Sequence, residues 1–329
     1  MNNLLFKKWN DFSGWIVFLI AAFVYGMTIE PTASFWDCPE FISCAEKLQV
    51  GHPPGAPFYM LVGNLFTQFA SEASQVSWLV NFLNALLSAG CILFLFWSIT
   101  RLVRSLIVNE EQNLSTIDVI VILGSGFVGA LAYTFSDTFW FSAVEGEVYA
   151  FSSFLTALVF WMILRWQDES DSVYGDRWII LIAFIIGLSI GVHLLNLLCI
   201  PAIVLVFYYQ KYHAISFKGV AAAIVISGLL IVFILFVYIP GIADMGGWFE
   251  LLLVNVLGFP FQSGLIIFLA LVVFLLIVAI YRFRKRIIHT TLWCMLALTM
   301  GYTTYAVILI RASANTPLNE NAPDNIFAL

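Results

Sequence analysis

The sequence predicts an all-α polytopic membrane protein, with about nine transmembrane helices and interfacial helices in its outer loops. Two observations predict this fold class. The 329 residues are 62% hydrophobic and 10% charged, whereas soluble domains are roughly 45–50% apolar and about 25% charged. The apolar residues also fall in runs of the length that crosses a bilayer, about 20 residues, and helices satisfy their own backbone hydrogen bonds in lipid.

Nine apolar runs are candidate spans, and two of them are parts of one longer run. That run extends from Trp178 to Tyr209, and Gly187, Gly191 and Pro201 are positions where a helix can break. The first run follows a basic flank and lacks a small-residue cleavage site, so we expect a retained span rather than a signal peptide. The predicted spans are 13–30, 77–100, 117–135, 148–166, 178–192, 195–210, 219–240, 264–281 and 290–310.

Lys and Arg are unevenly distributed between the two sides of this arrangement. If the N-terminus is cytoplasmic, all but two of the fourteen Lys and Arg lie at cytoplasmic ends, the exceptions being Lys47 and Arg311. The positive-inside rule therefore predicts a cytoplasmic N-terminus and, with nine spans, a C-terminus on the outer face. We expect a multi-pass protein of the bacterial inner membrane with a periplasmic C-terminus. Nucleic-acid binding is excluded, because it needs a basic stripe.

We expect one transmembrane domain over residues 1–310. The predicted outer loops are 31–76, 136–147 and 241–263. Within them, 57–70 and 247–261 are apolar yet too short or too polar to span, and they predict helices that lie in the interface. Residues 311–329 lose the apolar run and gain Asn, Pro and Asp, so they predict the start of a truncated periplasmic region.

The five Cys do not indicate a disulfide framework or a zinc site. Cys38 and Cys44 share the first outer loop, but a separation of six residues on a helix is awkward for a disulfide. Cys91, Cys199 and Cys294 lie in apolar runs, which is typical of small core residues. No spacing of Cys and His matches a zinc site.

The first outer loop concentrates polar residues that are scarce elsewhere. Asp37 is followed three residues later by Glu40, which predicts a helix over 39–48 with Asp37 as its cap and Glu40 closing a capping box. Alternatively, Asp37 is a general base at the membrane surface. The two interpretations compete in part, because hydrogen bonds to a capping carboxylate favour its charged form and lower its basicity.

Two further segments contain His in turns. Residues 51–57 hold three Pro and two Gly, which fix a rigid turn around His52. His193 and Asn196 lie between the fifth and sixth spans, where they either satisfy carbonyls freed by the helix break or take part in a site. His52 likewise either packs in its turn or acts with Asp37 on the same membrane face.

Acidic and aromatic residues gather at 133–151, and one Arg stands alone on the outer face. Aromatic residues and acids at a span end are ordinary at the interface. Glu147, however, lies near the hydrocarbon boundary, where an ionisable residue is a functional candidate. Arg311 either anchors the last span or binds phosphate through its planar fork.

Three motifs, taken in order, resemble the membrane-embedded GT-C glycosyltransferases. The likeness is strongest to bacterial multi-pass proteins related to the animal transmembrane O-mannosyltransferase of plexin-type domains, and it runs from about residue 10 to the end. Two features depart from that pattern: bulky residues flank the acid of the first motif, and members usually continue into a long soluble C-terminal region. The motifs are Asp37-Cys-Pro-Glu40, His52-Pro-Pro-Gly55 and Glu147-Val-Tyr149.

The resemblance implies transfer of a sugar from a polyprenyl-phosphate carrier to a protein or glycan hydroxyl at the outer face, most simply a protein Ser or Thr. It implies Asp37 and Glu40 as catalytic residues, and Arg311, His52 and His193 as ligands of the donor phosphate. It implies no cofactor and no metal, because phosphate leaves already charged. The expected residues of the substrate pocket are Trp36, Pro53, Pro54, Gly55, Glu145, Glu147, Tyr149 and Asn196.

Two other functions stay open at this point. A transporter also contains acids and broken spans, although here the polar groups gather at one face and we find no inverted repeat. A non-catalytic subunit of a membrane complex could retain the same fold without activity.

Overall fold

The computed structural model describes residues 1–108, 113–172, 174–212 and 214–329, and is built from helices. Within the described residues, eight helical segments are long and apolar enough to cross a membrane. The predicted all-α polytopic class is therefore confirmed. Among these residues none of the five Cys is in a disulfide.

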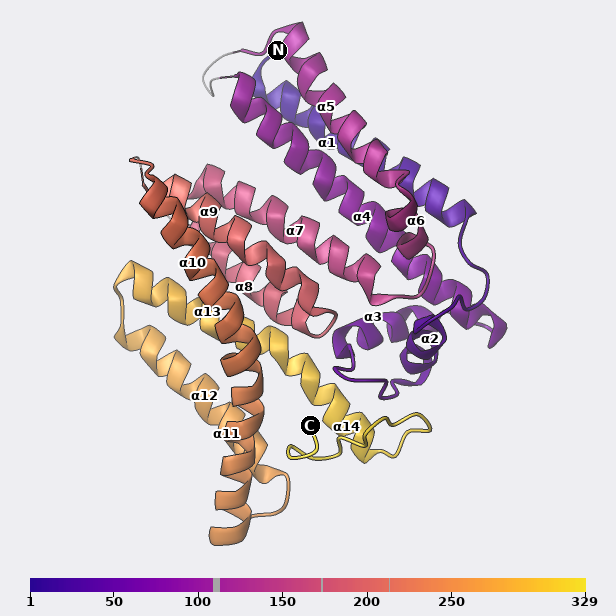
Figure 1. Cartoon of the computed structure of the whole chain (residues 1–329), viewed down its shortest axis with the longest axis vertical. Coiled ribbons are helices and arrows are strands. Elements are labelled where there is room, and N and C mark those ends of the chain that lie inside the picture. The colour runs from indigo at the N-terminus through magenta and orange to yellow at the C-terminus, as the bar shows by residue number, and fades with distance from the viewer. Residues whose placement is uncertain (109–112, 173, 213) are drawn as a thin grey trace. The chain divides into compact units, whose positions relative to one another are not determined.

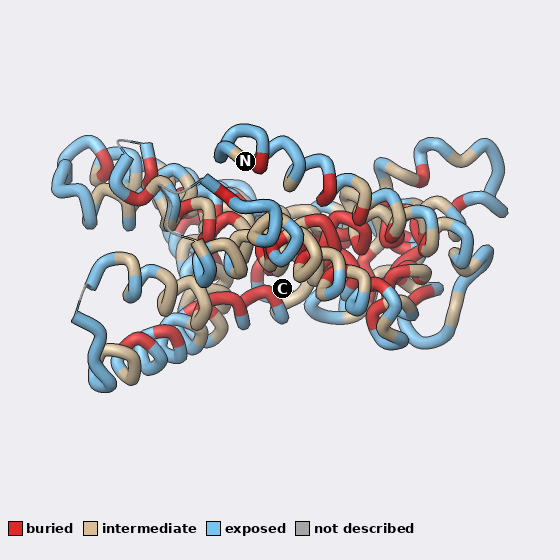
Figure 2. Tube along the Cα trace, turned by 90° about the horizontal axis from the view of Figure 1, so that it is seen from above, coloured by how far each residue is buried: buried red, intermediate tan, exposed pale blue. Residues whose placement is uncertain are grey.

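The helices group into two compact units, and the expected single transmembrane domain over residues 1–310 stays a prediction. Unit 1 combines Met1–Glu46 with Tyr59–Leu164, and unit 2 combines Lys47–Phe58 with Arg165–Leu329. Buried and exposed residues alternate along the helices (Figure 2), and many of the exposed residues are large and apolar. Outward apolar faces are expected for helices whose solvent is lipid.

Three long helices form the frame of unit 1. They are α1 (Asn3–Met27), α4 (Ser74–Ile107) and α5 (Thr116–Thr134), which lie side by side with α4 packed against both of the others (Figure 1). Small residues such as Ala21 and Ala89 line the buried seam. A capping box begins α5, since the Ser115 and Asp118 side chains each accept a hydrogen bond from the other's backbone N–H.

Shorter helices occupy the loops of unit 1. They are α2 (Cys38–Lys47), α3 (Pro57–Thr67) and α6 (Asp137–Ala143), and α7 (Val148–Glu169) follows them. The helix predicted for 39–48 is confirmed as α2, and α3 lies within the predicted interfacial segment. The sequence did not predict α6, a seven-residue helix in the second outer loop.

Unit 2 contains the broken run of the fifth and sixth predicted spans. It forms α8 (Asp176–Ile190), the 3₁₀ helix η1 (Leu194–Cys199) and α9 (Ile200–Lys211), so the break lies next to Gly191 as expected. The 15 residues of α8 extend about 22 Å, which is less than a hydrocarbon core of about 30 Å. For this reason α8 is not among the eight segments that are long enough to span.

The short helix α8 nevertheless lies along α13 (Arg286–Tyr302), which continues through η4 (Thr303–Tyr305) into α14 (Ala306–Ser313). At one end, Arg286 Nη2 lies 2.8 Å from Asp176 Oδ1. At the other end, the Tyr305 hydroxyl donates to the Ile190 carbonyl over 3.3 Å. The two helices therefore run parallel over the whole length of α8.

The seventh predicted span and the third predicted outer loop are wrong in their boundaries. One helical segment runs from Phe217 to Val256, 40 residues in all, and the loop shrinks to about 257–262. Its parts are α10 (Phe217–Phe233), η2 (Ile234–Tyr238), α11 (Ile239–Leu251) and η3 (Leu252–Val256).

Pro240 explains why the sequence suggested a break in this segment. A Pro inside a helix removes one backbone hydrogen bond. The widened π-helical turns of η2 directly precede Pro240, and such turns let a helix continue through a local defect. The helix α12 (Ser263–Arg282) then returns along α11. The predicted interfacial helix at 247–261 is thus mainly a continuation of the long helix.

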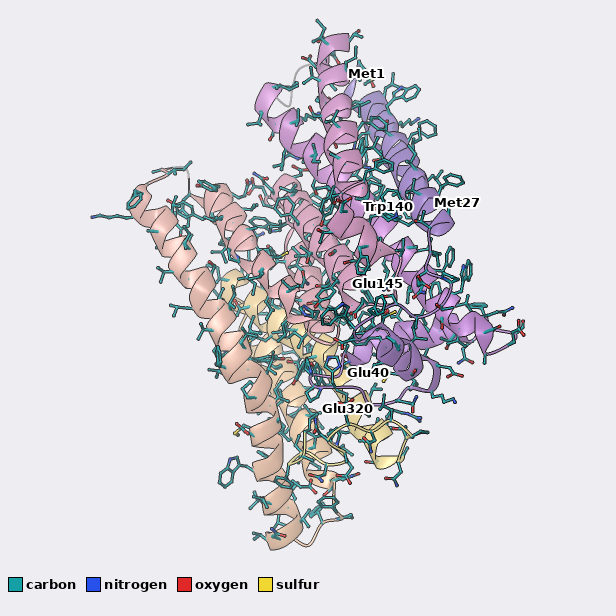
Figure 3. All side chains as sticks on the ribbon, turned by 45° about the vertical axis from the view of Figure 1, so that its right-hand side comes forward. Met1, Met27, Glu40, Trp140, Glu145 and Glu320 are labelled. Carbon is teal, nitrogen blue, oxygen red and sulfur yellow. The ribbon has the colours of Figure 1, made fainter. Side chains whose placement is uncertain are left out.

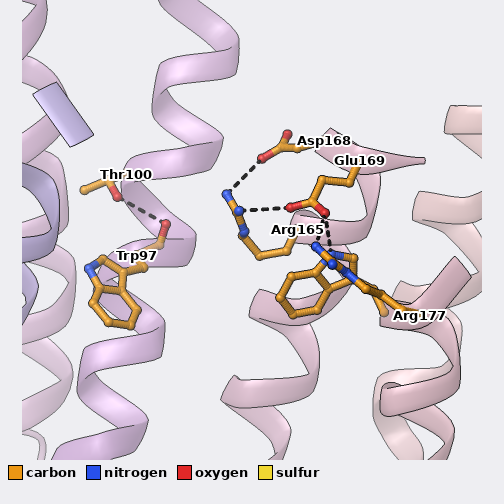
Figure 4. Close-up of polar contacts among 7 residues, drawn as sticks. Trp97, Thr100, Arg165, Asp168, Glu169 and Arg177 are labelled. Atoms are coloured by element: carbon orange, nitrogen blue, oxygen red, sulfur yellow. Dashed lines mark hydrogen bonds and ion pairs between the residues drawn. The ribbon is translucent and has the colours of Figure 1, made fainter. Parts of the chain in front are cut away.

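Ion pairs join the polar ends of the unit 2 helices. Glu169 accepts hydrogen bonds from Arg177 (2.8 Å) and from the Trp178 indole (3.0 Å), and Arg165 pairs with it over 3.1 Å (Figure 4). Partly exposed pairs of this kind stabilise by less than about 1 kcal/mol each. They fix the helix ends near one another more than they hold the fold together.

Close contact between α8 and α13 depends on two glycines. A Cβ at Gly187 would lie 2.3 Å from the Leu298 carbonyl oxygen, and one at Gly301 would lie 2.5 Å from the Phe184 carbonyl oxygen. The two backbones therefore touch, and side chains larger than hydrogen would separate them.

We expect Gly187→Ala to destabilise unit 2 by about 1–3 kcal/mol, because overpacking forces the backbones apart. Gly228→Ala is the matched control, since a Cβ at Gly228 in α10 meets nothing within 4 Å. The control should leave stability unchanged or raise it by about 0.5–1 kcal/mol, the usual gain from Gly to Ala inside a helix. Thermal unfolding in detergent, followed by Trp fluorescence, measures both; equal midpoints for the two variants would contradict the close contact.

Candidate functional site

The predicted catalytic pair lies at the first turn of α2. Phe41 N–H donates to the Asp37 carbonyl over 2.9 Å, so the helix begins at Asp37. Carboxylate oxygens of Asp37 and Glu40 lie within 4.8 Å of one another, and the Asp37 side chain is exposed. Paired carboxylates suit a proton-accepting site, and their oxygens also suit hard cations. The expectation of a metal-free site stays a prediction.

The residues around Asp37 present its carboxylate outward. Trp36 is 89% exposed and has φ +64°, a left-handed conformation that bulky residues adopt rarely. On the other side, Cys38 is fully buried against the backbones of Ser34 and Gly146, and burial raises the pKa of its thiol. Asp37 thus stands between an exposed ring and a buried anchor.

A second loop of unit 1, between α6 and α7, contains two buried acids and contacts the loop that precedes α2. Glu145 and Glu147 are each only 6% exposed. The Ser34 hydroxyl donates to the Glu145 carboxylate, and the Glu147 carboxylate accepts from Val148 N–H over 3.3 Å at the start of α7. Figure 3 shows Glu40 and Glu145 toward the same end of unit 1, away from Met1.

The two acids of this loop have different surroundings from Asp37. Burial raises the pKa of the Glu145 carboxyl, and the nearby charge of Glu30 adds to the rise, while the Ser34 hydroxyl opposes it. Tyr149, the third member of the motif, is exposed at the first turn of α7. The structure therefore places two buried carboxyl groups next to the loop of the exposed pair.

Two residues of α4, which were not predicted from the sequence, donate hydrogen bonds to these loops. The Asn84 side chain donates to the carbonyls of Glu145 and Glu147 (2.7 Å to the latter). Asn81 donates to the carbonyls of Glu30 and Thr32 over 2.6 and 2.8 Å. The signal was present in the sequence, because two Asn three residues apart are unusual within an apolar span.

Tyr59 of α3 was also overlooked. It is fully buried, and its hydroxyl donates to Asn84 Oδ1 over 3.3 Å. Its ring contacts Phe41 of α2 edge-on, with 5.6 Å between ring centroids. An aromatic residue with one polar atom is suited to such a position between an apolar core and a hydrogen-bonded layer.

The predicted turn around His52 belongs to unit 2. Gly55 N–H donates to the His52 carbonyl over 2.9 Å, and Phe58 N–H donates to the Gly191 carbonyl over 2.7 Å. Gly55 has φ +90°, and a Cβ there would lie 2.7 Å from Ile308 Cδ1. Only glycine suits both the backbone conformation and the contact with α14.

The Arg311 side chain donates to two backbone carbonyls within unit 2. Its Nε donates to the Leu48 carbonyl over 2.7 Å, and its Nη2 donates to the Lys47 carbonyl over 2.9 Å. Leu48 has φ +47° directly after the helix, and a basic side chain at the last carbonyls of a helix is stabilising. The expected contact between Arg311 and a donor phosphate stays a prediction.

His193 and Asn196 lie at the broken run. The His193 Nδ1 accepts from Leu195 N–H over 3.1 Å and caps η1. A ring nitrogen that accepts carries no proton, so the cap fits the tautomer with its proton on Nε2, and burial lowers the pKa of the His193 ring. Asn196 is fully buried in η1. His193 therefore caps the break by accepting a backbone N–H and does not satisfy a freed carbonyl there, and contact of His193 and Asn196 with substrate stays a prediction.

Comparison with known proteins bears on these motifs. The model of the family "Protein O-mannosyl-transferase TMEM260 N-terminal domain" matches residues 37–216, which is more than half of the chain and begins at Asp37. The matched residues include His52, Glu147 and His193. Arg311 lies outside them.

Two curated proteins are similar to the chain. "Protein O-mannosyl-transferase tmem260" of Dictyostelium discoideum is 24% identical over 148 residues, which is 45% of this chain and 16% of that protein. "Protein O-mannosyl-transferase TMEM260" of Mus musculus is 26% identical over 174 residues, which is 53% of this chain and 22% of that protein. The chain thus spans roughly a fifth of the length of the curated relatives it matches. No solved structure matches the chain.

The raised pKa of Glu145 predicts a pH-dependent effect of Glu145→Gln. A carboxyl whose folded pKa lies above its ordinary value of 4.5 favours folding when protonated, and this contribution is lost as pH rises through the folded pKa. We expect Glu145→Gln to unfold at a higher temperature than wild type at pH 8 and at a similar temperature at pH 4. Melting curves of both proteins over this range test it, and a lower midpoint for the variant at pH 8 would contradict the assignment.

Proposed function

The chain belongs to the family defined by the N-terminal domain of protein O-mannosyl-transferase TMEM260, and from this premise we propose that it is a membrane-embedded glycosyltransferase. It moves a sugar, by analogy with the relatives' names a mannose, from a polyprenyl-phosphate carrier to a hydroxyl of a protein acceptor at the outer face of the membrane. The observation that carries the proposal is the exposed Asp37, which opens α2 within 4.8 Å of Glu40.

In the proposed reaction, Asp37 is the general base. The acceptor oxygen attacks the anomeric carbon, Asp37 takes the hydroxyl proton, and the bond between that carbon and the phosphate oxygen breaks. The electron pair leaves with the phosphate, which is stable as an anion and needs no proton. Glu40 is near enough to accept a hydrogen bond from a sugar hydroxyl and so to orient the ring.

Exposed aromatic rings near the acids are suited to the sugar. Trp36 is 89% exposed and Tyr149 is 46% exposed, and ring faces present apolar area with little conformational freedom to lose. Glu145 and Glu147 are buried, so we assign them to the floor of the pocket and to its polarity. We also propose Pro53, Pro54, Gly55 and Asn196 as residues of the substrate pocket.

The donor phosphate would meet hydrogen-bond donors of unit 2. Arg311 has five N–H groups, of which two serve the carbonyls of Leu48 and Lys47. His193 carries a proton on Nε2 when it caps η1, which makes it a donor without charge. We propose these two residues and His52 as phosphate ligands, because a phosphate near the lipid boundary is poorly hydrated and gains from such donors.

The proposed chemistry requires these groups to lie on the outer face. We propose a cytoplasmic N-terminus, a periplasmic C-terminus and a bacterial inner membrane, with α8 as a ninth crossing beside α13. The parallel course of α8 and α13 supports this, because α13 belongs to a segment of 28 residues that is long enough to span.

We expect Asp37→Asn to lower the rate of sugar transfer by at least about 10²-fold, because general base catalysis contributes roughly 10²–10⁴-fold. Glu72→Gln is the matched control, as Glu72 is an exposed acid in the same outer loop, and it should leave the rate within about twofold. Transfer from a radiolabelled polyprenyl-phosphate sugar to an acceptor peptide measures both. A rate for Asp37→Asn within about tenfold of wild type would rule out Asp37 as the base.

The orientation predicts which engineered Cys react with a membrane-impermeant reagent added to intact cells after removal of the outer membrane. Probes at Glu72 and Asn321 should react, and probes at Asp171 and His289 should stay unlabelled until the cells are opened, because the positive-inside rule places them in the cytoplasm. The reverse pattern would invert the orientation. Reaction at His289 but not at Asp171 would show that α8 does not cross, because Asp171 precedes α8 in the chain and His289 follows it.

A further inference from the structure

Asn81 and Asn84 form a buried amide pair on one face of α4. Both are 0% exposed, and a spacing of three residues places them on the same side of the helix. A buried amide is costly unless its N–H groups and oxygen find partners. The positions of those partners show what the pair does in the fold.

The pair donates hydrogen bonds to two loops, the one between α1 and α2 and the one between α6 and α7. Asn81 donates to the carbonyls of Glu30 and Thr32 in the first loop (2.6 and 2.8 Å). Asn84 donates to the carbonyls of Glu145 and Glu147 in the second loop. A single turn of α4 therefore fixes the positions of both loops that carry the candidate acids.

The two loops are also joined to each other above the pair. Glu30 N–H donates to the Val144 carbonyl over 3.1 Å, and the Ser34 hydroxyl donates to the Glu145 carboxylate. Cys38 packs against the Gly146 backbone. The register of Asp37, which lies between Ser34 and Cys38, therefore follows from the position of the second loop.

Gly146 closes this arrangement without room for a side chain. A Cβ at Gly146 would lie 3.0 Å from Asn81 Oδ1, 3.1 Å from Ile42 Cγ1 and 3.2 Å from Val80 Cγ1. The second loop thus contacts α2 and α4 at once. Any change that lifts this loop must move Cys38 with it.

We propose that Asn81 and Asn84 are positioning residues, which hold the loop of Asp37 against the loop of Glu145 and Glu147 and so orient the carboxylate of Asp37 for reaction. The statement about Asp37 rests on the proposed function. We call these hydrogen bonds between α4 and the two loops the clamp. The clamp is a property of the fold, and an experiment that does not need enzyme activity can test it.

The experiment compares Asn84→Leu, which keeps the branched shape of the side chain but removes its two N–H donors and the acceptor of the Tyr59 hydroxyl, with Ser88→Ala. Ser88 is the matched control, because it lies one turn further along α4, is 0% exposed, and among the described residues its hydroxyl has no hydrogen-bond partner. The first readout is the rate at which Cys38 reacts with a small alkylating reagent, read by peptide mass spectrometry with buried Cys91 as internal reference.

We expect Asn84→Leu to raise the alkylation rate of Cys38 relative to Cys91 by at least tenfold, and Ser88→Ala to leave it unchanged. In the full-length protein, Asn84→Leu should lower kcat at least tenfold and change the KM for the lipid donor by less than threefold, because the donor contacts are elsewhere. A purely structural role would lower the amount of folded protein and leave kcat per folded molecule unchanged.

Unchanged Cys38 reactivity in folded Asn84→Leu would overturn the clamp, whatever the activity. Raised Cys38 reactivity with unchanged kcat would support the clamp but overturn the claim that it positions Asp37. Inactivity of the wild type would contradict only the proposed function, because the Cys38 readout does not need turnover. If Asn84→Leu does not fold, Gly146→Ala replaces it, because the added Cβ would push the second loop away from Asn81 and Ile42, and the same outcomes apply.

Discussion

The hydrogen bonds that the Asn81 and Asn84 amides donate to four loop carbonyls are the interaction on which the rest of unit 1 depends. Non-helical backbone near lipid is stable only where its polar groups have partners inside the protein. The loops that carry Glu30, Thr32, Glu145 and Glu147 are irregular, and α4 supplies those partners.

The same requirement shapes the turn around His52 in unit 2. Arg311 satisfies the last carbonyls of α2, Gly191 accepts from Phe58, and Val50 pairs with the C-terminal tail through Leu318 (3.1 Å). Each contact serves a backbone group left over at the end of a helix. The motif residues are therefore held by ordinary capping interactions from parts of the chain that are distant in sequence.

Apolar run length predicted most of the helices, because lipid imposes a length and a composition on each span. It failed at residues 241–256, where a loop was predicted after Pro240, but the helix continues through π-helical turns. The spacing of Asp37 and Glu40 predicted α2, because helix capping depends on residues that are close in sequence. Asn81, Asn84 and the use of Arg311 depend on contacts across 49 to 264 residues, and no local pattern encodes those.

The central claim is that a carrier lipid donates the sugar to an acceptor at the Asp37 loop. The most direct measurement gives the purified full-length protein an acceptor peptide with either a polyprenyl-phosphate sugar or the corresponding nucleotide sugar, and weighs the peptide by mass spectrometry. The account predicts that one hexose is added from the lipid-linked donor and none from the nucleotide sugar. Addition from the nucleotide sugar, or from neither donor by folded protein, would contradict it.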